Sequence, residues 1–334
     1  MPRTLVRVGS EIPLLDLRSF GHQGPDGRLQ VSPAFLGQLV RTASHAPEVM
    51  VKVSGGANST RGAITHLKYI DRHGKLELET DEGQRLEGKG IEAALVADWD
   101  LEAQRANARG PYRRTAGRRP VKLVHNVILS MPKGTSPEKL LSASREFARE
   151  QFALEHRYAL VLHTDQEHPH VHLVIKTVSE QGERLNIRKA TLREWRGQFA
   201  RHLRAHGIAA NATERAVRGQ SRSGFKDGIH RAWLRADSRH LRDRAERIAR
   251  ELRSGNLKPT QGKARLLETR REVIAGWHAA ADALLESGQG GLAEKIWGFI
   301  GAMSPPRTTD EQLAAEHEER TRTRERERQE ERTR

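Results

Sequence analysis

The stretch that decides the fold, residues 158–178, reads YALVLHTDQEHPHVHLVIKTV. Two runs rich in aliphatic and β-branched residues, 158–163 and 170–178, flank a polar segment that ends in a proline. This pattern is typical of two antiparallel strands joined by a tight turn, which we place at residues 166–169. A turn there would pair Asp165 with His170 and His163 with His172.

The histidines of this hairpin are spaced so that they gather on one face. Strand side chains alternate, so His170 and His172 share a face, and His163 shares one with Asp165. Three neutral imidazoles leave an open coordination position, which suits a catalytic metal ion, with the carboxylate as a supporting or direct ligand. His168 falls in the turn and points elsewhere. A turn of surface histidines and a purely structural zinc site are the two alternatives.

The elements expected around this hairpin alternate between strands and helices. They are a helical pattern near 35–40, a strand at 49–53, a loop at 54–58, a helix at 60–70, a hairpin-like segment at 75–83, a strand at 121–129, and helices at 136–156 and 190–206. They predict an α+β fold with a central antiparallel sheet flanked by helices. From residue 228 the pattern is only helical.

We divide the chain into four parts. Residues 1–47 form an N-terminal extension of unknown role, and 48–220 form the domain that carries the histidines. Residues 228–303 are a helical region, and 304–334 are a charged tail that is either helical or disordered.

Composition restricts the possible partners and chemistry. Lys and Arg total 58 against 43 acidic residues, a net charge of +15 that favours a polyanion, most simply nucleic acid. The chain has no cysteine, which excludes disulfides, thiolate nucleophiles and cysteine zinc sites. No apolar run is long enough for a membrane span, so we expect a cytoplasmic protein without membrane insertion.

An open metal site in a basic protein suggests attack on a phosphate, either by water or by a side chain. Without cysteine, a covalent route needs Ser, Thr or Tyr, and the chain has three tyrosines. Tyr158 starts a strand and is expected in the core, whereas Tyr112 lies in a basic loop and could stack on a base. Tyr69 lies near the end of a helix among basic residues, where it is either the nucleophile or an ordinary half-buried tyrosine.

Basic residues near these motifs are candidates for contacts with DNA phosphates, although each could equally be a solvated surface charge. They are Arg113, Arg114, Arg118, Arg119, Lys122, Arg188 and Lys189. Lys176 shares a strand face with His170 and His172, so it is the candidate for stabilising charge in the transition state. His125 could help to activate the tyrosine, but we favour a buried, hydrogen-bonded histidine.

Three blocks within residues 49–215 carry a family resemblance. They are 51–74 with Tyr69-Ile70-Asp71-Arg72, 124–134 with Leu129-Ser130-Met131-Pro132, and 160–178 with the histidines. The chain resembles the conjugative relaxases, the plasmid mobilisation nucleases of the HUH endonuclease superfamily. Relaxases place the tyrosine before the histidine pair, as here, whereas rolling-circle replication initiators usually place it after.

The resemblance implies a site and a reaction. Tyr69 would attack one DNA strand at an origin of transfer, forming a 5′-phosphotyrosyl intermediate that can be rejoined. His163, His170 and His172 would bind the metal, supported by Asp165. The family uses magnesium or manganese, although three imidazoles suit softer ions. Implied partners are single-stranded DNA, accessory proteins of a nicking complex and a coupling protein of a secretion channel.

Three functions therefore stay open. The first is the relaxase, with residues 48–220 as its nicking domain. The second is a metal-dependent hydrolytic nuclease or a rolling-circle replication initiator. The third is a basic DNA-binding protein, not an enzyme, in which the metal site is structural.

Overall fold

The computed structural model describes residues 33–101, 121–220, 239–254 and 261–333. The chain divides into two compact units, each treated by itself below. Among the described residues, 45–212 belong to the first unit, and 33–44 together with those from 213 onward belong to the second. Four of the predicted basic residues (Arg113, Arg114, Arg118, Arg119) and Tyr112 lie outside the described residues.

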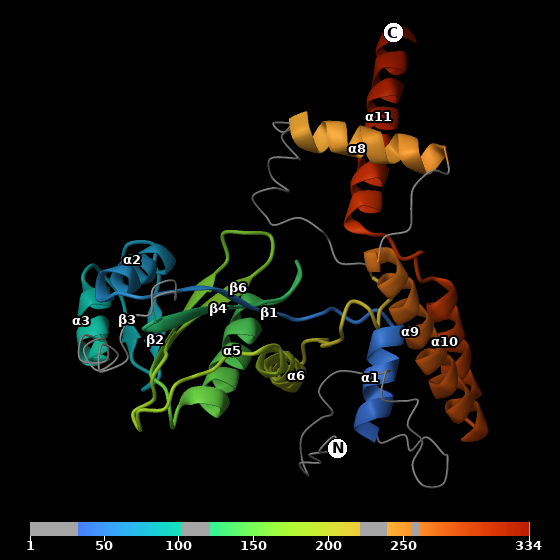
Figure 1. Ribbon diagram of the computed structural model, residues 1–334. Coiled ribbons are helices and arrows are strands. Elements are labelled where there is room, and N and C mark those ends of the chain that lie inside the picture. Colours follow the sequence, from blue (N-terminus) through green and yellow to red (C-terminus); the bar gives the residue numbers. More distant parts are fainter. Residues whose placement is uncertain (1–32, 102–120, 221–238, 255–260, 334) are drawn as a thin grey trace. The chain divides into compact units, whose positions relative to one another are not determined.

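The first unit is built on a six-stranded antiparallel sheet with the strand order β1-β4-β6-β5-β2-β3 (Figure 1). The strands are β1 (Met50–Ala57), β2 (Leu78–Thr80), β3 (Arg85–Leu86), β4 (Val124–Ser130), β5 (Tyr158–His163) and β6 (His170–Lys176). The two runs of the deciding stretch are thus β5 and β6, which pair in the middle of the sheet. The predicted fold class, an antiparallel sheet with flanking helices and a helical C-terminal region, is confirmed.

One face of the sheet packs against α5 (Pro137–Phe152) and α6 (Lys189–Ala205). Every residue of β6 is buried, and its odd-numbered side chains, Val171, Leu173 and Ile175, join the larger hydrophobic core on this face. Helix α5 begins where Ser136 accepts a hydrogen bond from the backbone N–H of Lys139 at 3.3 Å. The even-numbered residues of β6 therefore point to the opposite face.

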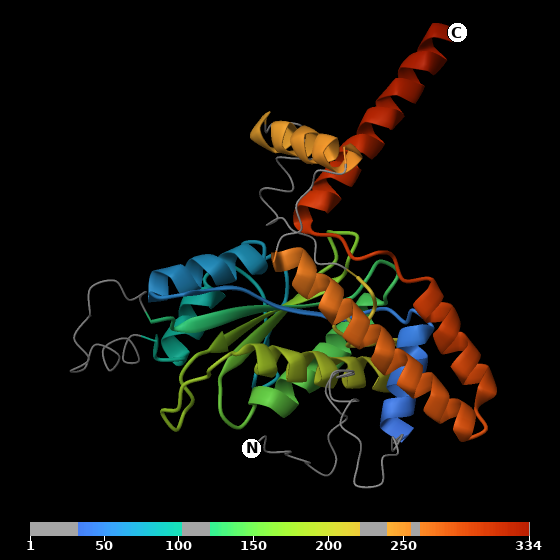
Figure 2. The ribbon, with the colours of Figure 1, turned by 45° about the vertical axis from the view of Figure 1, so that its right-hand side comes forward.

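The opposite face is covered by α2 (Thr60–Ile70) and α3 (Ile91–Asp98), as Figure 2 shows from the side. Helix α2 buries Ala63, Leu67 and Ile70 in a second hydrophobic core, which includes Val174 from β6. The i, i+4 and i+7 spacing of these helix residues produces one apolar stripe. The side chains on the neighbouring stripe of α2 lie near the end of β6 that carries the histidines.

Strand β1 continues through the segment predicted as a loop. Its pairing with β4 shifts between Val53 and Gly55, which marks a bulge, and then resumes to Ala57. A Cβ added at Gly56 would lie 2.3 Å from the carbonyl oxygen of Val124. The glycines thus permit close approach to β4, whereas in the sequence they suggest a turn.

The register of β5 and β6 differs from the prediction by two residues. His163 lies opposite His170 and Val161 opposite His172, so that the connecting loop spans residues 164–169. The predicted pairs of Asp165 with His170 and His163 with His172 are wrong. A two-residue shift leaves every side chain on its predicted face, so the hydrophobic pattern cannot reveal it. The longer loop releases Asp165 from the sheet.

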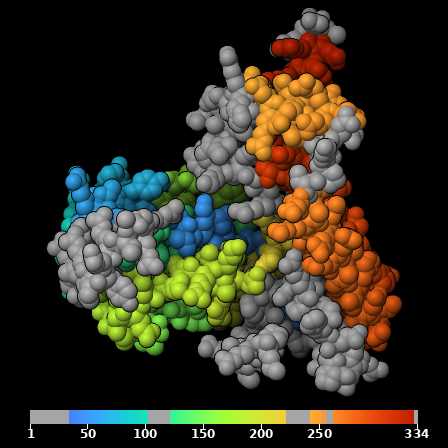
Figure 3. All heavy atoms as spheres, viewed as in Figure 1, coloured from blue at the N-terminus to red at the C-terminus, as the bar shows by residue number. Residues whose placement is uncertain are grey.

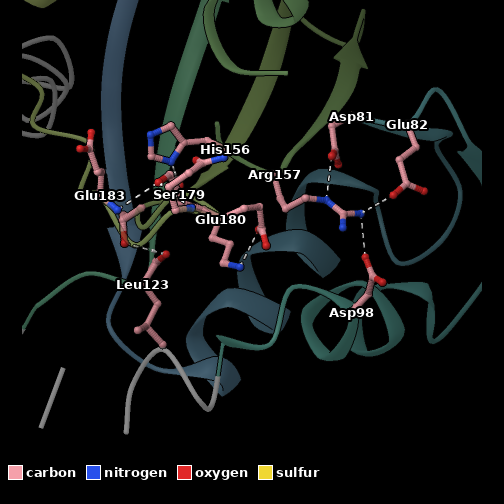
Figure 4. A network of polar contacts seen from close by, with 12 residues as sticks. Asp81, Glu82, Asp98, Leu123, His156, Arg157, Ser179, Glu180 and Glu183 are labelled. Carbon is pink, nitrogen blue, oxygen red and sulfur yellow. Dashed lines mark hydrogen bonds and ion pairs between the residues drawn. The ribbon is translucent and has the colours of Figure 1, made fainter. Parts of the chain in front are cut away.

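Arg157 joins β5 to the other elements at the opposite end from this loop. Its guanidinium contacts Asp81 at 2.7 Å, Asp98 at 2.8 Å and Glu82 at 3.2 Å, as Figure 4 shows. Asp81 and Glu82 follow β2 in the chain, and Asp98 ends α3. The backbone N–H of Lys176 donates to the carbonyl of Arg157, so Lys176 lies at this end of the sheet too.

The second unit contains only helices among its described residues. These are α1 (Pro33–Ala43), α8 (Arg239–Arg253), α9 (Gln261–Glu286), α10 (Gly290–Gly301) and α11 (Thr309–Thr333). Phe35 and Leu39 of α1 are buried in one cluster with Trp277 and Phe299 of α9 and α10. Spheres of α8, α9 and α11, orange to red, lie on the surface in Figure 3.

The charged tail forms α11, which packs against α8. Arg244 of α8 contacts Asp310 at 2.6 Å, and Ala314 is buried with Ile248 and Ala249. No helix among the described residues is long and apolar enough to cross a membrane.

Candidate metal and tyrosine site

Three imidazoles meet at the end of β5 and β6. His163, His170 and His172 each offer one nitrogen, and these nitrogens lie within 4.8 Å of one another. The ring centroids are 4.4 to 5.1 Å apart, and the three side chains are 1–7% exposed. We call this group the histidine cluster. It is the one group of this kind among the described residues that could hold a metal ion.

Hydrogen bonds fix which nitrogen stays available in two of these rings. Nε2 of His163 lies 2.6 Å from the carbonyl oxygen of Ile70, and Nδ1 of His170 lies 3.1 Å from that of His168. A carbonyl can only accept, so each of these nitrogens carries the hydrogen and the other keeps a lone pair, which in His163 faces Nη2 of Arg72 at 3.4 Å. Nδ1 of His172 is buried without a hydrogen-bond partner. This donor set fits a divalent ion, which would satisfy the orphaned nitrogen.

Burial favours the neutral form of two of the three imidazoles, those of His163 and His172. Burial, followed by the charges of His163 and His170, lowers the pKa of His172 to about 3. Burial also lowers the pKa of His163, with a further contribution from Arg72. A metal ligand must be the neutral imidazole, so these shifts leave lone pairs available at neutral pH.

Helix α2 places Tyr69 beside the cluster. Ser59 caps the helix by accepting from the N–H of Gly62 at 3.1 Å, and Ile70 ends it. Tyr69 is 59% exposed, so its phenol is accessible to a large substrate. The His66 ring lies near both groups, with its centroid 6.4 Å from that of Tyr69 and 6.3 Å from that of His172.

Arg72 contacts three groups of the candidate site. Its guanidinium carbon lies 5.3 Å from the centre of the Tyr69 ring, and its Nη2 is 3.4 Å from Nδ1 of His163. The same Nη2 forms an ion pair with Asp165. Although desolvation acts in the opposite direction, the hydrogen bond and charge of Arg72 hold the pKa of Asp165 below its usual range. The carboxylate approaches His163 no closer than 3.9 Å.

The turn after α2 has an unusual backbone that directs Arg72. Arg72 and His73 have φ angles of 56° and 61°, and Gly74 follows with 78°. Two consecutive left-handed residues other than glycine are costly, at roughly 1–2 kcal/mol each. The buried Asp71 holds the turn, because its carboxylate accepts from the N–H of Gly74 at 3.2 Å. The turn reverses the chain, so Arg72 lies over Tyr69.

Other predicted residues lie away from the cluster. Lys176 is four residues beyond His172 on β6, a rise of about 13 Å, and pairs with Glu180 at 2.9 Å. His125 lies on the α5–α6 face, since it pairs with Ile175 in the register. Tyr158 is 2% exposed, and burial raises its pKa to about 12. The core position expected of Tyr158 is confirmed.

The described basic candidates occupy the surface. Nζ of Lys122 donates to the carbonyl of Gly55 at 3.0 Å. Arg188 and Lys189 are exposed at the start of α6.

From the sequence, His66 and Arg72 belong to the basic surroundings of Tyr69 without a role of their own, and Lys52 is not indicated at all. His66, Tyr69 and Arg72 follow an i, i+3 spacing, which could have indicated a common side of the helix end. Lys52 is exposed and pairs with Ile128, which in turn pairs with His172, so its side chain is on the face of the cluster. No sequence signal indicates that β1 is two strands from β6.

Comparison with known families identifies the central part of the chain. Residues 72–208 match the family model of the relaxase nuclease domain, MobA/VirD2-like. This segment of the chain is therefore similar to a relaxase nuclease domain. The matched segment contains Asp165 and the histidine cluster, and Tyr69 lies three residues before it.

Curated relatives point to the same family. The chain is 28% identical over 216 residues to the T-DNA border endonuclease VirD2 of Agrobacterium fabrum, covering 58% of this chain and 46% of that protein. It is 29% identical over 193 residues to VirD2 of Rhizobium rhizogenes, with 52% and 42% covered. The VirD2 of Rhizobium radiobacter is 26% identical over 210 residues, with 58% and 48% covered. The chain thus spans about half the length of the curated relatives it matches.

Proposed function

We propose that this protein is a conjugative relaxase that nicks one DNA strand at an origin of transfer and can rejoin it. The observation that carries the proposal is the accessible Tyr69 beside three buried imidazoles. Its supports are the relaxase family of residues 72–208 and the net charge of +15. Single-stranded DNA is the proposed substrate, because the family resemblance implies it and an unpaired strand is flexible enough to reach a tyrosine beside the face of a sheet.

In the proposed reaction, the phenol oxygen of Tyr69 forms a bond to the scissile phosphorus. The bond from phosphorus to the 3′ oxygen breaks, the phenol gives up its proton, and in net balance the 3′ oxygen takes up one proton and leaves as a free 3′-hydroxyl. The strand downstream stays attached to Tyr69 through its 5′ phosphate. Attack by a 3′-hydroxyl reverses the same step, since the phosphodiester energy is conserved in the tyrosyl bond.

His163, His170 and His172 are the proposed ligands of a divalent ion, which when bound supplies polarisation of a phosphate oxygen. The family resemblance favours magnesium or manganese. Asp165 and Arg72 position His163 and Tyr69, and His66 excludes water from the space between Tyr69 and His172. We assign no catalytic contact to Lys176, because its ion pair lies at the other end of β6. Accessory proteins of a nicking complex and a coupling protein of a secretion channel are proposed partners in the cytoplasm.

Replacing Tyr69 with Phe tests the covalent route. The protein is incubated with Mn²⁺ and a library of random single-stranded oligonucleotides labelled at the 3′ end, and then run on a denaturing gel. The wild type should produce labelled DNA attached to protein, and sequencing that DNA identifies the nick site. Tyr69→Phe should lose the adduct and the cleavage, because only the attacking oxygen is removed.

Tyr158→Phe is the matched control, since it removes a phenol oxygen from the core. It should cleave like the wild type. If Tyr69→Phe cleaves at the wild-type rate and no adduct forms, then water is the attacking group and the protein is a hydrolytic nuclease. Metal binding without any cleavage would favour a DNA-binding protein with a structural metal site.

A further inference from the structure

A second polar concavity lies on the α5–α6 face of the sheet, opposite the histidine cluster. It is a groove of about 630 Å³ at the ends of β1 and β4, bordered by residues 184–187 and the first turns of α6. Yellow-green spheres, which belong to α6 and the segment before it, lie on the surface in Figure 3. No part of the proposed nicking reaction uses this groove.

The charge of the groove is positive. Lys122 and Arg184 line it, and none of its lining residues is acidic. Arg184 is exposed and donates to the backbone carbonyl of Lys122 at 2.7 Å, which fixes its guanidinium next to residue 122, while Nζ of Lys122 donates to the carbonyl of Gly55. Helix α6 starts at Lys189, directly after this segment, so its N-terminal N–H groups add positive potential. Such a surface favours an anion.

His125 gives the groove a neutral acceptor. Its ring lies against the backbone of Leu185, and its Nδ1 is buried without a hydrogen-bond partner. Burial, followed by the charges of Lys122 and Arg184, lowers its pKa to about 4. Because this nitrogen is shielded from solvent, a ligand's amino or hydroxyl group would donate to it only after the ring turns toward the groove.

The rest of the lining is apolar. Val53, Ile187 and Leu192 are partly exposed at the margin of the main core. Apolar surface beside two cations and a neutral acceptor suits a ligand with a phosphate, a flat ring and polar ring substituents.

We propose that this groove binds a nucleotide, with its phosphate at Lys122 and Arg184 and its base on the apolar side near His125. The nucleotide is either a unit of the DNA strand or a free mononucleotide. The first source rests on the proposed function. Strand β1 is the edge of the sheet, with Lys52 on the cluster face and Val53 on the groove face. DNA leaving the cluster can cross this edge into the groove.

The test measures binding to the full chain in EDTA, which prevents cleavage. A fluorescent single-stranded oligonucleotide is followed by anisotropy, and deoxyadenosine monophosphate by equilibrium dialysis. The main variant is Lys122→Gln with Arg184→Gln. Asn186→Asp, an isosteric change at an exposed lining residue, adds a negative charge without disturbing packing. The matched control is Lys139→Gln with Arg149→Gln, which removes two exposed cations from α5.

The main variant should bind the oligonucleotide roughly tenfold more weakly, and its log–log salt slope should fall by about 0.7 for each phosphate that the variant no longer neutralises. Asn186→Asp should weaken binding in the same direction, whereas the control should keep the wild-type slope. If only mononucleotide binding disappears, the free nucleotide is the ligand. If both variants match the control with both ligands, the groove proposal is wrong, whatever the result for Tyr69→Phe. If the wild type does not bind the oligonucleotide, the proposed function fails, and the mononucleotide result alone decides on the groove.

Discussion

Each imidazole of the histidine cluster reaches the same end of the sheet from a different position on its strand. His163 is the last residue of β5, whereas His170 and His172 begin β6. Rigid strands hold these rings, and the loop between them can vary without moving them. A site on strands is more exactly placed than one on loops, which suits a role in binding a metal.

Replacing any one of the three histidines with Ala should abolish nicking and Mn²⁺ binding. Each variant removes one of three nitrogen donors, and the remaining pair no longer defines a site. Cleavage on the gel and Mn²⁺ uptake by equilibrium dialysis are the two measurements. His168→Ala is the matched control, because that ring lies in the adjoining loop and accepts from the N–H of Lys133 instead. Equal Mn²⁺ uptake in the His170 and His168 variants would argue against the metal site.

Arg72→Gln should lower the cleavage rate by about 10- to 100-fold, because Asp165 and Tyr69 lose the group that positions them. Binding of single-stranded DNA should change far less. Lys68→Gln is the control, since Lys68 is an exposed cation in the last turn of α2, close in sequence to Arg72. A parallel loss of rate in both variants would show that general positive charge, rather than positioning by Arg72, is responsible.

The sequence predicted which strand side chains share a face of the sheet better than it predicted which side chains contact one another. Alternation along 158–178 predicted correctly which side chains share a face, because that depends on local geometry alone. The pairing of Asp165 was wrong, because loop length and the distant Arg72 decide it. Tyr69 was singled out by its basic neighbours, but its approach to the cluster depends on the packing of α2 over the sheet, which local sequence does not encode.

At the scale of elements, β1 shows how a glycine pair can mislead. Gly55 and Gly56 suggest a turn, yet they continue the strand beside Val124. We predict that Gly56→Ala lowers the free energy of unfolding by about 1–3 kcal/mol, because the new Cβ would overlap a backbone oxygen that cannot move freely. Gly55→Ala should be nearly neutral, since its Cβ would meet only Asn126 Nδ2 at 3.9 Å.

Urea denaturation of both glycine variants measures this difference. Equal midpoints would mean that β1 shifts to accommodate the methyl group. Cleavage should fall in Gly56→Ala only as far as the folded fraction falls, because neither glycine contacts the histidine cluster.

At the scale of the molecule, buried neutral histidines outside the cluster predict a loss of stability in acid. Burial lowers the pKa of His125 to about 4 and also lowers that of His156. The unfolded chain binds protons at these sites first, so their contribution is complete above pH of about 6.5 and declines as the pH falls toward 4. Thermal midpoints measured in EDTA should drop across this range, and less so in His125→Asn. A midpoint that is constant from pH 7 to 5 would contradict this.

The packing of the helical segments could be predicted from the sequence only in part. A helical C-terminal region follows from the absence of strand patterns after residue 228. The burial of Phe35 and Leu39 with Trp277 could not be foreseen, because it joins segments more than two hundred residues apart. Length and charge pattern predict that such segments are helical, but they do not predict the surface against which each helix packs.

At the left-handed turn of Arg72 and His73, selection for stability and selection for cleavage would favour different residues. Glycine at position 73 would relieve backbone strain and could raise stability, since glycine adopts positive φ without steric cost. The same change would make the backbone next to Arg72 more flexible. The Arg72 side chain would then be held less firmly over the ring of Tyr69. Consensus or automated design that aims only at stability would therefore tend to lower the cleavage activity that depends on this turn. Libraries selected for thermostability alone should accumulate glycine there, and those selected for cleavage should keep a side chain.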